Sequence, residues 1–314
     1  GFITTPKFFI VVCILIFLAG LGAGLFIVPL DTFIQIAMPK KTRGEGLALN
    51  AFLSWVGIAL SGVFMLIFDK ISLPANGGFL FFVIPAGVLF IFSQHYLKDF
   101  FFRFCVNFIV KLAYKVRTIG IENVPVQGPA ILIVNHASYM DSLLLCATTR
   151  RRIRFLMSRD IYERWRWCRP IFKMYGVIPV DNRSSPRQVA MAIRDARKAL
   201  DQGYLVCVFA EGGITRTGTI RAFKSGFARI LRGTNYPIIP IYLGGSWGTI
   251  YHYYQGQLVR KWFRLSLMRY PVTVMFGKAL PATTDAFHVR RAVMELSCDY
   301  FNSRKIEHKS LAKS

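Results

Sequence analysis

Long uncharged stretches dominate the first 97 residues of the chain. Runs of 23 residues without a charged side chain cover 8–30 and 46–68, and a third apolar run covers 79–97. A helix of about 20 apolar residues is long enough to cross a lipid bilayer. The pattern therefore predicts three transmembrane helices within residues 1–97.

The charges beside these runs predict their orientation. The first loop carries Lys40, Lys41 and Arg43, and many Lys and Arg residues follow the third run, whereas Asp69 and Lys70 balance the second loop. Lys and Arg are enriched in loops on the cytoplasmic side of a membrane. We therefore expect the first loop and everything after residue 97 on the cytoplasmic side, with the N-terminus outside.

Residues 98–118 mix aromatic and basic side chains at helical spacing. Such a segment is typical of an amphipathic helix that lies in the lipid headgroup layer. An ordinary amphipathic helix packed on the following domain has the same pattern, and the sequence leaves both interpretations open.

After residue 118 the periodicity changes, and short β-branched runs alternate with helical patterns. We predict strands over 131–134, 153–157, 176–180, 205–209, 237–243 and 272–276, and helices over 139–149, 160–175 and 186–202. This alternation predicts an α/β domain over 119–303, in which helices flank a mixed, largely parallel sheet. A loose basic tail is expected over 304–314.

Composition and charge agree with two different parts. Hydrophobic residues make up 54% of the chain and charged residues 18%, which excludes a disordered protein and is unusual for a soluble domain. The formal net charge is +24; residues 1–96 hold 5 Lys/Arg and 3 Asp/Glu, so +22 lies in 97–314. Such an excess favours an anionic partner. Nucleic acid is disfavoured because no DNA- or RNA-binding motif is present.

The start of the chain and its cysteines carry little chemistry. No positively charged stretch precedes the first apolar run, so no signal peptide is expected, and Gly1 in first place indicates a chain that begins inside a longer protein. The six cysteines are scattered, without a CxxC pair or a His at metal-ligand spacing. We expect reduced thiols and no metal site.

A histidine and an aspartate follow the predicted strand over 131–134. The segment from Asn135 to Asp141 reads Asn-His-Ala-Ser-Tyr-Met-Asp. Open α/β sheets bind ligands at the C-terminal ends of their strands. If Asp141 reaches back to one nitrogen of His136, the other nitrogen can act as a general base toward a substrate hydroxyl. A structural His bonded to a helix-capping Asp is the alternative.

A second group of polar residues follows the strand over 205–209. Gly212 and Gly213 would let backbone N–H groups approach an anion, and Arg216 would contact a phosphate. The alternative is a Gly-rich turn in which Glu211 is solvated.

Two further segments have simpler interpretations. The apolar strand over 237–241 contains Pro237 and Pro240, which favours an edge strand. Residues 244–248 fit the GxSxG pattern of serine hydrolases around Ser246. The expected helix after the nucleophile is missing from the pattern, so a hydrolase is disfavoured.

Together, these elements resemble the glycerolipid acyltransferase family, which includes bacterial lysophosphatidic acid acyltransferases. The resemblance covers about residues 100–303 and includes the NHxxxxD motif at Asn135, His136 and Asp141. Part of the family's FPEGTRS motif is matched by Phe209, Glu211, Gly212 and Arg216, and its proline-flanked strand by Pro237–Ile241.

Two departures from the family pattern concern the acceptor. The GxIxVDR motif usually ends in Arg, but here Asn182 follows Asp181 and Arg183 comes one place later; Ala210 replaces a Pro in the third motif. The EGxITxTG form resembles the acyltransferase part of acyl-carrier-protein synthetase/2-acylglycerophosphoethanolamine acyltransferase fusions. Residues 1–97 resemble the last three spans of the major facilitator transporter that precedes this part in such fusions, although three spans alone cannot form the transporter.

The resemblance implies an enzyme of the inner (cytoplasmic) membrane, with its catalytic domain on the cytoplasmic face. It would move an acyl group directly from acyl carrier protein or coenzyme A to a lysophospholipid hydroxyl, with no other cofactor. His136, oriented by Asp141, would be the base, and the acceptor would bind Asn135, Glu211, Gly212, Arg216 and Arg183. A basic–aromatic surface would face anionic headgroups or the acidic carrier protein; its residues are Arg150, Arg151, Arg152, Arg154, Arg164, Trp165, Arg166 and Trp167.

Overall fold

The computed structural model describes residues 6–39, 41–72, 74–180, 186–249, 252–254, 257–259 and 269–311. The chain divides into two compact units, Gly1–Cys105 and Val106–Ser314.

The first unit is built from long apolar helices. They are α1 (Pro6–Ala37), α2 (Arg43–Lys70) and the greater part of α3 (Ala75–Ala113). Among the described residues, α2 is the one helix that is long and apolar enough, by length and composition, to cross a membrane. The three predicted spans therefore stay a prediction.

The segment 98–118 differs from its predicted form. Its helical part is the end of α3, which stops at Ala113, and Tyr114–Ile119 forms strand β1. The predicted helix is therefore too long. Tyr114 is almost fully buried and β-branched residues follow it, which favours an extended strand over a further helical turn. Val106 and Val110, four residues apart on α3, are also buried, as expected for a helix face packed against protein.

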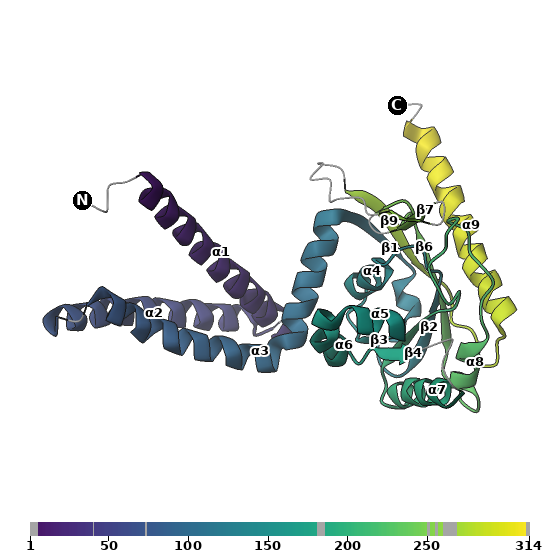
Figure 1. Ribbon diagram of the computed structural model, residues 1–314, viewed down its shortest axis with the longest axis horizontal. Coiled ribbons are helices and arrows are strands. Elements are labelled where there is room, and N and C mark those ends of the chain that lie inside the picture. The colour runs from purple at the N-terminus through teal and green to yellow at the C-terminus, as the bar shows by residue number, and fades with distance from the viewer. Residues whose placement is uncertain are drawn as a thin grey trace. The chain divides into compact units, whose positions relative to one another are not determined.

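A seven-stranded sheet forms the centre of the second unit (Figure 1). Its order is β1-β9-β6-β2-β5-β3-β4, and its pairs are parallel except for the antiparallel pair β6–β9. This is the mixed, largely parallel sheet predicted from the sequence. The strands are β2 (Ala130–Val134), β3 (Ile153–Ser158), β4 (Ile178–Val180), β5 (Leu205–Phe209), β6 (Ile238–Gly244) and β9 (Tyr270–Phe276). A separate hairpin consists of β7 (His252–Tyr254) and β8 (Gln257–Val259).

Helices cover both faces of the sheet, on either side of it in Figure 1. Leu132 and Val134 of β2 pack in one core cluster with Leu145 of α4. Ile131 and Ile133, which point to the other face, pack in a second cluster with residues of α7, α8 and α9. Since both faces are covered, β2 is apolar throughout, as parallel strands in the middle of a sheet are.

The helices of this unit are α4 (Asp141–Thr148), α5 (Arg159–Arg164), α6 (Arg169–Tyr175), α7 (Pro186–Asp201), α8 (Gly226–Leu231) and α9 (Ala286–Leu311), with short 3₁₀ turns at Ile121–Asn123 and Arg166–Cys168. Of these, α4 and α7 begin and end close to the predicted bounds, whereas α8 and α9 were not predicted from the sequence. The single helix predicted over 160–175 is broken at Trp165, whose ψ of 58° is not helical. The basic tail predicted from 304 is helical as far as Leu311, as part of α9.

Strand β6 is not the edge strand that its prolines favour. It lies between β2 and β9 and is buried along its whole length. Pro240 has no N–H to donate to a neighbouring strand. Its carbonyl accepts a hydrogen bond at 2.8 Å from the N–H of Gly277, which lies just beyond the end of β9. Regular pairing with β9 starts only at Ile241, so the missing N–H leaves no carbonyl of β9 without its donor.

Candidate active site

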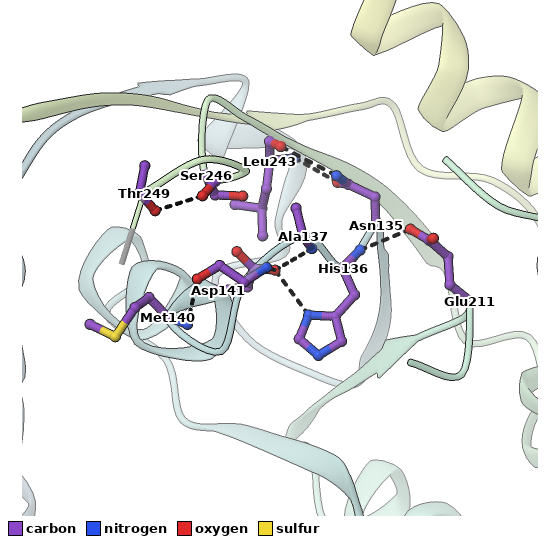
Figure 2. A network of polar contacts seen from close by, with 10 residues as sticks. Asn135, His136, Ala137, Met140, Asp141, Glu211, Leu243, Ser246 and Thr249 are labelled. Carbon is purple, nitrogen blue, oxygen red and sulfur yellow. Dashed lines mark hydrogen bonds and ion pairs between the residues drawn. The ribbon is translucent and has the colours of Figure 1, made fainter. Parts of the chain in front are cut away.

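His136 and Asp141 meet at the C-terminal end of β2, as predicted. The Nδ1 atom of His136 lies 2.9 Å from Oδ2 of Asp141 (Figure 2). Asp141, the first residue of α4, is fully buried, whereas the His136 side chain keeps 17% of its surface exposed. A carboxylate can only accept here, so the proton of the pair belongs on Nδ1 and the lone pair on Nε2.

The same oxygen of Asp141 shapes the turn between the two residues. Oδ2 accepts hydrogen bonds from the N–H groups of Ala137 at 2.7 Å and Ser138 at 2.8 Å. Asp141 therefore fixes the backbone that carries His136 as well as its ring. Asp141 thus has the structural role of the alternative interpretation and also contacts the ring of His136. The two roles do not exclude each other, because the His136 side chain remains partly exposed.

The imidazole of His136 is held between the turn and the sheet. It stacks on Phe209 at the end of β5, with ring centroids 4.0 Å apart and an angle of 18° between the planes. Its Nε2 atom lies on the side of the ring away from Asp141 (Figure 2). His136 lines a pocket of about 520 Å³, so the free nitrogen has access to a bound molecule.

Glu211 supports the backbone of His136 instead of lying in the solvent. It is 2% exposed, and its Oε1 accepts the His136 N–H at 2.9 Å while Oε2 accepts the Arg221 N–H at 3.1 Å. Burial raises the pKa of the Glu211 carboxyl, and these two hydrogen bonds oppose part of that rise. The carboxylate faces two backbone groups, which makes Glu211 a positioning residue here and not a wall for the acceptor.

Asn135 has a similar supporting place. Its side-chain oxygen accepts the Leu243 N–H at 2.7 Å, and its amide donates to the Leu243 carbonyl at 3.2 Å. These two bonds tie the end of β2 to β6. The predicted contact of Asn135 with the acceptor is therefore replaced by a contact between neighbouring strands.

The pocket beside His136 is apolar in its interior. Its walls come from β3, β4, β5, α7 and α8 and include Leu156, Val180, Val189, Ile193, Val208 and Phe227. Cavities of this size that are lined by aliphatic side chains accept apolar groups. The interior therefore suits a hydrocarbon chain.

Four cations line the pocket, and among the described residues that line it there is no Asp or Glu. Arg216 is one of these lining residues, together with Arg221, Lys224 and Arg229, and all four are exposed, so they form the rim of the pocket. The predicted contact of Arg216 with a phosphate stays a prediction. Arg221, Lys224 and Arg229 were not predicted from the sequence, because they come five to thirteen residues after Arg216, in a loop and a short helix. Four cations at one opening suit a phosphate group.

Gly212 is also placed on the pocket wall. Its φ of +72° is a conformation that glycine adopts readily and other residues rarely do. A Cβ atom there would lie 2.7 Å from Cε of Lys224, so a side chain would displace one of the rim cations. Arg183 lies outside the described residues.

The alternative serine nucleophile has the wrong surroundings. Ser246 is fully buried, and Thr249 turns back to it by donating to its carbonyl at 2.6 Å. No helix follows it in the described part of this loop. Asp285 and His288 are exposed neighbours near the start of α9, with His288 Nδ1 2.7 Å from Asp285 Oδ1. Ser246, Asp285 and His288 therefore do not form a catalytic triad with Ser246 on a nucleophile elbow.

In the ranges that the structure describes, there is no cluster of three or more His, Cys, Asp or Glu side chains that could hold a metal ion. The metal-free reaction expected from the sequence stays a prediction.

Comparisons with known proteins match this part of the chain. Residues 115–244 match the Acyltransferase family model. A probable 1-acyl-sn-glycerol-3-phosphate acyltransferase of Mycoplasma pneumoniae is 27% identical over 152 residues, which are 47% of this chain and 56% of that protein. A 1-acyl-sn-glycerol-3-phosphate acyltransferase of Borreliella burgdorferi is 31% identical over 142 residues, covering 45% of this chain and 56% of the relative.

The chain thus spans little more than half the length of these curated relatives. The crystal structure of the 1-acyl-sn-glycerophosphate acyltransferase of Thermotoga maritima superposes with a TM-score of 0.49 at 18% identity, covering 79% of this chain and 95% of that one. His136, Asp141, Glu211 and Arg216 all fall within residues 115–244, the segment of this chain that is similar to acyltransferases.

Proposed function

We propose that the chain is a glycerolipid acyltransferase that moves a fatty acyl group from a thioester to the free glycerol hydroxyl of a lysophospholipid. The observation that carries this proposal is the Asp141–His136 pair at a pocket with an apolar interior and a cationic rim. An acyl thioester and a lysophospholipid need these three features together: a base, a place for a hydrocarbon chain and a place for a phosphate.

The reaction follows from the arrangement of the pair. The Nε2 atom of His136 takes the proton of the glycerol hydroxyl as its oxygen attacks the thioester carbonyl. The tetrahedral intermediate collapses, the carbon–sulfur bond breaks, and the departing sulfur receives the proton from His136. The carboxylate of Asp141 accepts the hydrogen bond from the Nδ1–H of His136 throughout and stabilises the imidazolium between the two steps.

The remaining residues of the site either support the backbone around His136 or bind the substrates. Glu211 and Asn135 hold the backbone at both sides of His136. Arg216, with Arg221 and Lys224, would contact the phosphate of the acceptor, and the interior between β3 and α7 would take an acyl chain. The acyl donor is acyl carrier protein or coenzyme A.

The proposal about the headgroup of the acceptor rests on sequence features alone. The third motif has Ala210 before Glu211 and continues to Arg216, and Arg183 is displaced by one position. We take these departures to favour an acceptor with a headgroup such as ethanolamine over free lysophosphatidic acid. We also retain the proposal of an integral inner-membrane enzyme whose first 97 residues resemble the end of a transporter.

The test is acyl transfer by the full chain in membranes. Labelled acyl carrier protein and acyl-CoA are offered with lysophosphatidylethanolamine, lysophosphatidylglycerol or lysophosphatidic acid. We expect product with at least one pair and a fall of about 10²–10⁴-fold in His136→Ala, the usual contribution of general-base catalysis. Ser246→Ala serves as a control for the hydrolase alternative and should retain transfer if it folds.

Two results would contradict the proposal. One is a folded protein that gives no product with any pair. The other is loss of activity in Ser246→Ala while His136→Ala stays active, which would favour the serine nucleophile. The preferred acceptor would also decide the proposal about the headgroup.

A further inference from the structure

We propose that the segment Arg159–Tyr175, which comprises α5, a 3₁₀ turn and α6, docks on an anionic lipid surface next to the opening of the pocket. This inference rests on the proposed function, because a lysophospholipid acceptor is supplied from a membrane.

Two large aromatic side chains of this segment lie in the solvent. Trp167 is 76% exposed and Trp165 39% exposed, and their rings stack with centroids 5.9 Å apart and planes at 18°. They lie on either side of the break between α5 and α6, in a run of exposed residues from Glu163 to Trp167. Each exposed indole leaves apolar surface in water, which is unfavourable unless a partner covers it.

The opposite side of the segment is already packed. Tyr162 of α5 and Phe172 of α6 have ring centroids 5.4 Å apart, and Cys168 and Tyr175 are buried. The two tryptophans are therefore not part of this packed core. They form a separate outer surface, which needs a partner other than the domain that carries it.

The charge around the tryptophans is positive. Residues 159–175 contain five basic and two acidic side chains, and Glu163 lies 3.9 Å from Arg159 as a surface ion pair. Arg164 and Arg166 are exposed and alternate with the tryptophans. Indoles beside Arg and Lys are the composition of protein surfaces at the headgroup layer, where the ring is half in contact with hydrocarbon and the cation meets lipid phosphate.

The same segment borders the pocket. Ile161 lines the pocket together with His136 and with Ser158, which directly precedes the segment, and Ile161 lies one helical turn before Trp165. Docking of the tryptophans would therefore bring the opening of the pocket to the level of the headgroups. An acidic carrier protein would complement the charge equally well, but it would not require two stacked indoles, so we favour the lipid surface.

The experiment uses the full chain in bilayer discs of phosphatidylglycerol and phosphatidylcholine, with or without a lipid spin-labelled near its headgroup. Subtracting the fluorescence of W165F/W167F from that of the wild type isolates the emission of the two indoles. We expect the quencher to reduce this difference emission by about half or more, as for rings at the membrane interface. The matched control is the difference between the wild type and Trp247→Phe, because Trp247 is also partly exposed but lies outside the segment; it should not be quenched.

A charge-reversed variant tests the electrostatic part. R164E/R166E should lose most of the quenching in phosphatidylglycerol discs, with an unchanged circular dichroism spectrum. Unquenched difference emission in wild-type protein would overturn the proposal. So would protection of the indoles from aqueous acrylamide by acidic acyl carrier protein without any lipid quenching, since the partner would then be a protein.

The outcome is separable from that of the proposed function. His136→Ala should lose acyl transfer and keep the quenching. Quenching without transfer by the wild type would contradict the enzyme and support the docking surface, whereas transfer without quenching would contradict the docking surface alone.

Discussion

One oxygen of Asp141 holds three donors, the imidazole Nδ1 of His136 and the N–H groups of Ala137 and Ser138. Such an oxygen can be neither rotated away nor protonated without loss, because each donor would be left facing a neutral group or another donor. The orientation of His136 and the shape of its turn thus have a common cause.

We therefore expect Asp141→Asn to impair catalysis much more than folding. An asparagine can turn its oxygen toward the backbone donors, but it lacks the charge that stabilises the imidazolium. The turnover rate should fall about 10²–10⁴-fold, with a small change in melting temperature. Acyl-transfer rates and thermal unfolding of the two proteins check this. If Asp141→Asn instead lowers the melting temperature strongly and the folded fraction keeps the wild-type turnover rate, Asp141 is only a capping residue.

Glu211 makes a prediction about pH. Burial raises the pKa of its carboxyl in the folded protein above the ordinary value of 4.5. A group with a raised pKa contributes stability that is present below the unfolded pKa and is lost as the pH rises through the folded pKa. The wild type should therefore lose stability relative to the non-titrating Glu211→Gln as the pH rises from 4.5 toward neutrality.

Melting temperatures of both proteins across this range give the comparison. Glu211→Gln replaces one accepting oxygen with a donor, so it should be less stable by a constant amount, and the test concerns the difference in slope. Parallel curves would show that the Glu211 carboxyl does not titrate in the range where burial places its pKa.

At the scale of elements, α7 connects the fold with the substrate. Its inner side chains Ala192, Ala196 and Leu200 pack against the sheet, while Val189 and Ile193 line the pocket. The neighbouring Met191 points outward and is 56% exposed. One helix therefore offers a pocket residue and a solvent residue next to each other.

We expect Ile193→Phe to shift selectivity toward shorter acyl chains. The larger ring reduces the apolar interior, and a displaced part of a long chain costs about 1–3 kcal/mol, or roughly tenfold in kcat/KM or more. Transfer from a series of acyl-CoA lengths measures this. Met191→Phe adds a similar volume on the outer face and should leave the series unchanged. The same shift in both variants would contradict the assignment of the pocket to the acyl chain.

For the whole molecule, the two compact units differ in what surrounds their apolar side chains. Among the side chains described within residues 1–105, only Phe68 is buried, whereas the second unit has apolar clusters on both faces of its sheet. A unit with its own closed core should fold by itself.

A chain of residues 106–314 should accordingly fold without the first unit. We expect a mixed α/β circular dichroism spectrum and one cooperative thermal transition. A broad, non-cooperative transition, or a spectrum without helical and strand bands, would show that the sheet needs the first unit. The full chain measured in membranes or discs is the control.

Local patterns determined those features whose cause lies within a few residues. Strand β5 has the predicted bounds, because its apolar run ends at turn residues on both sides, and α7 follows its amphipathic spacing from Pro186. The His136–Asp141 contact could also be predicted, because only one tight turn separates the two residues.

The tertiary structure decided what depends on partners far away in the chain. Strand β1 was missed because its pairing partner, β9, lies 156 residues later. Glu211 and Asn135 have supporting roles because their partners are 75 and 108 residues away, at His136 and Leu243. A sequence shows which side chains can donate or accept, but only the packing of strands shows which groups they meet, since an accepting oxygen bonds to whichever donor the fold brings within reach.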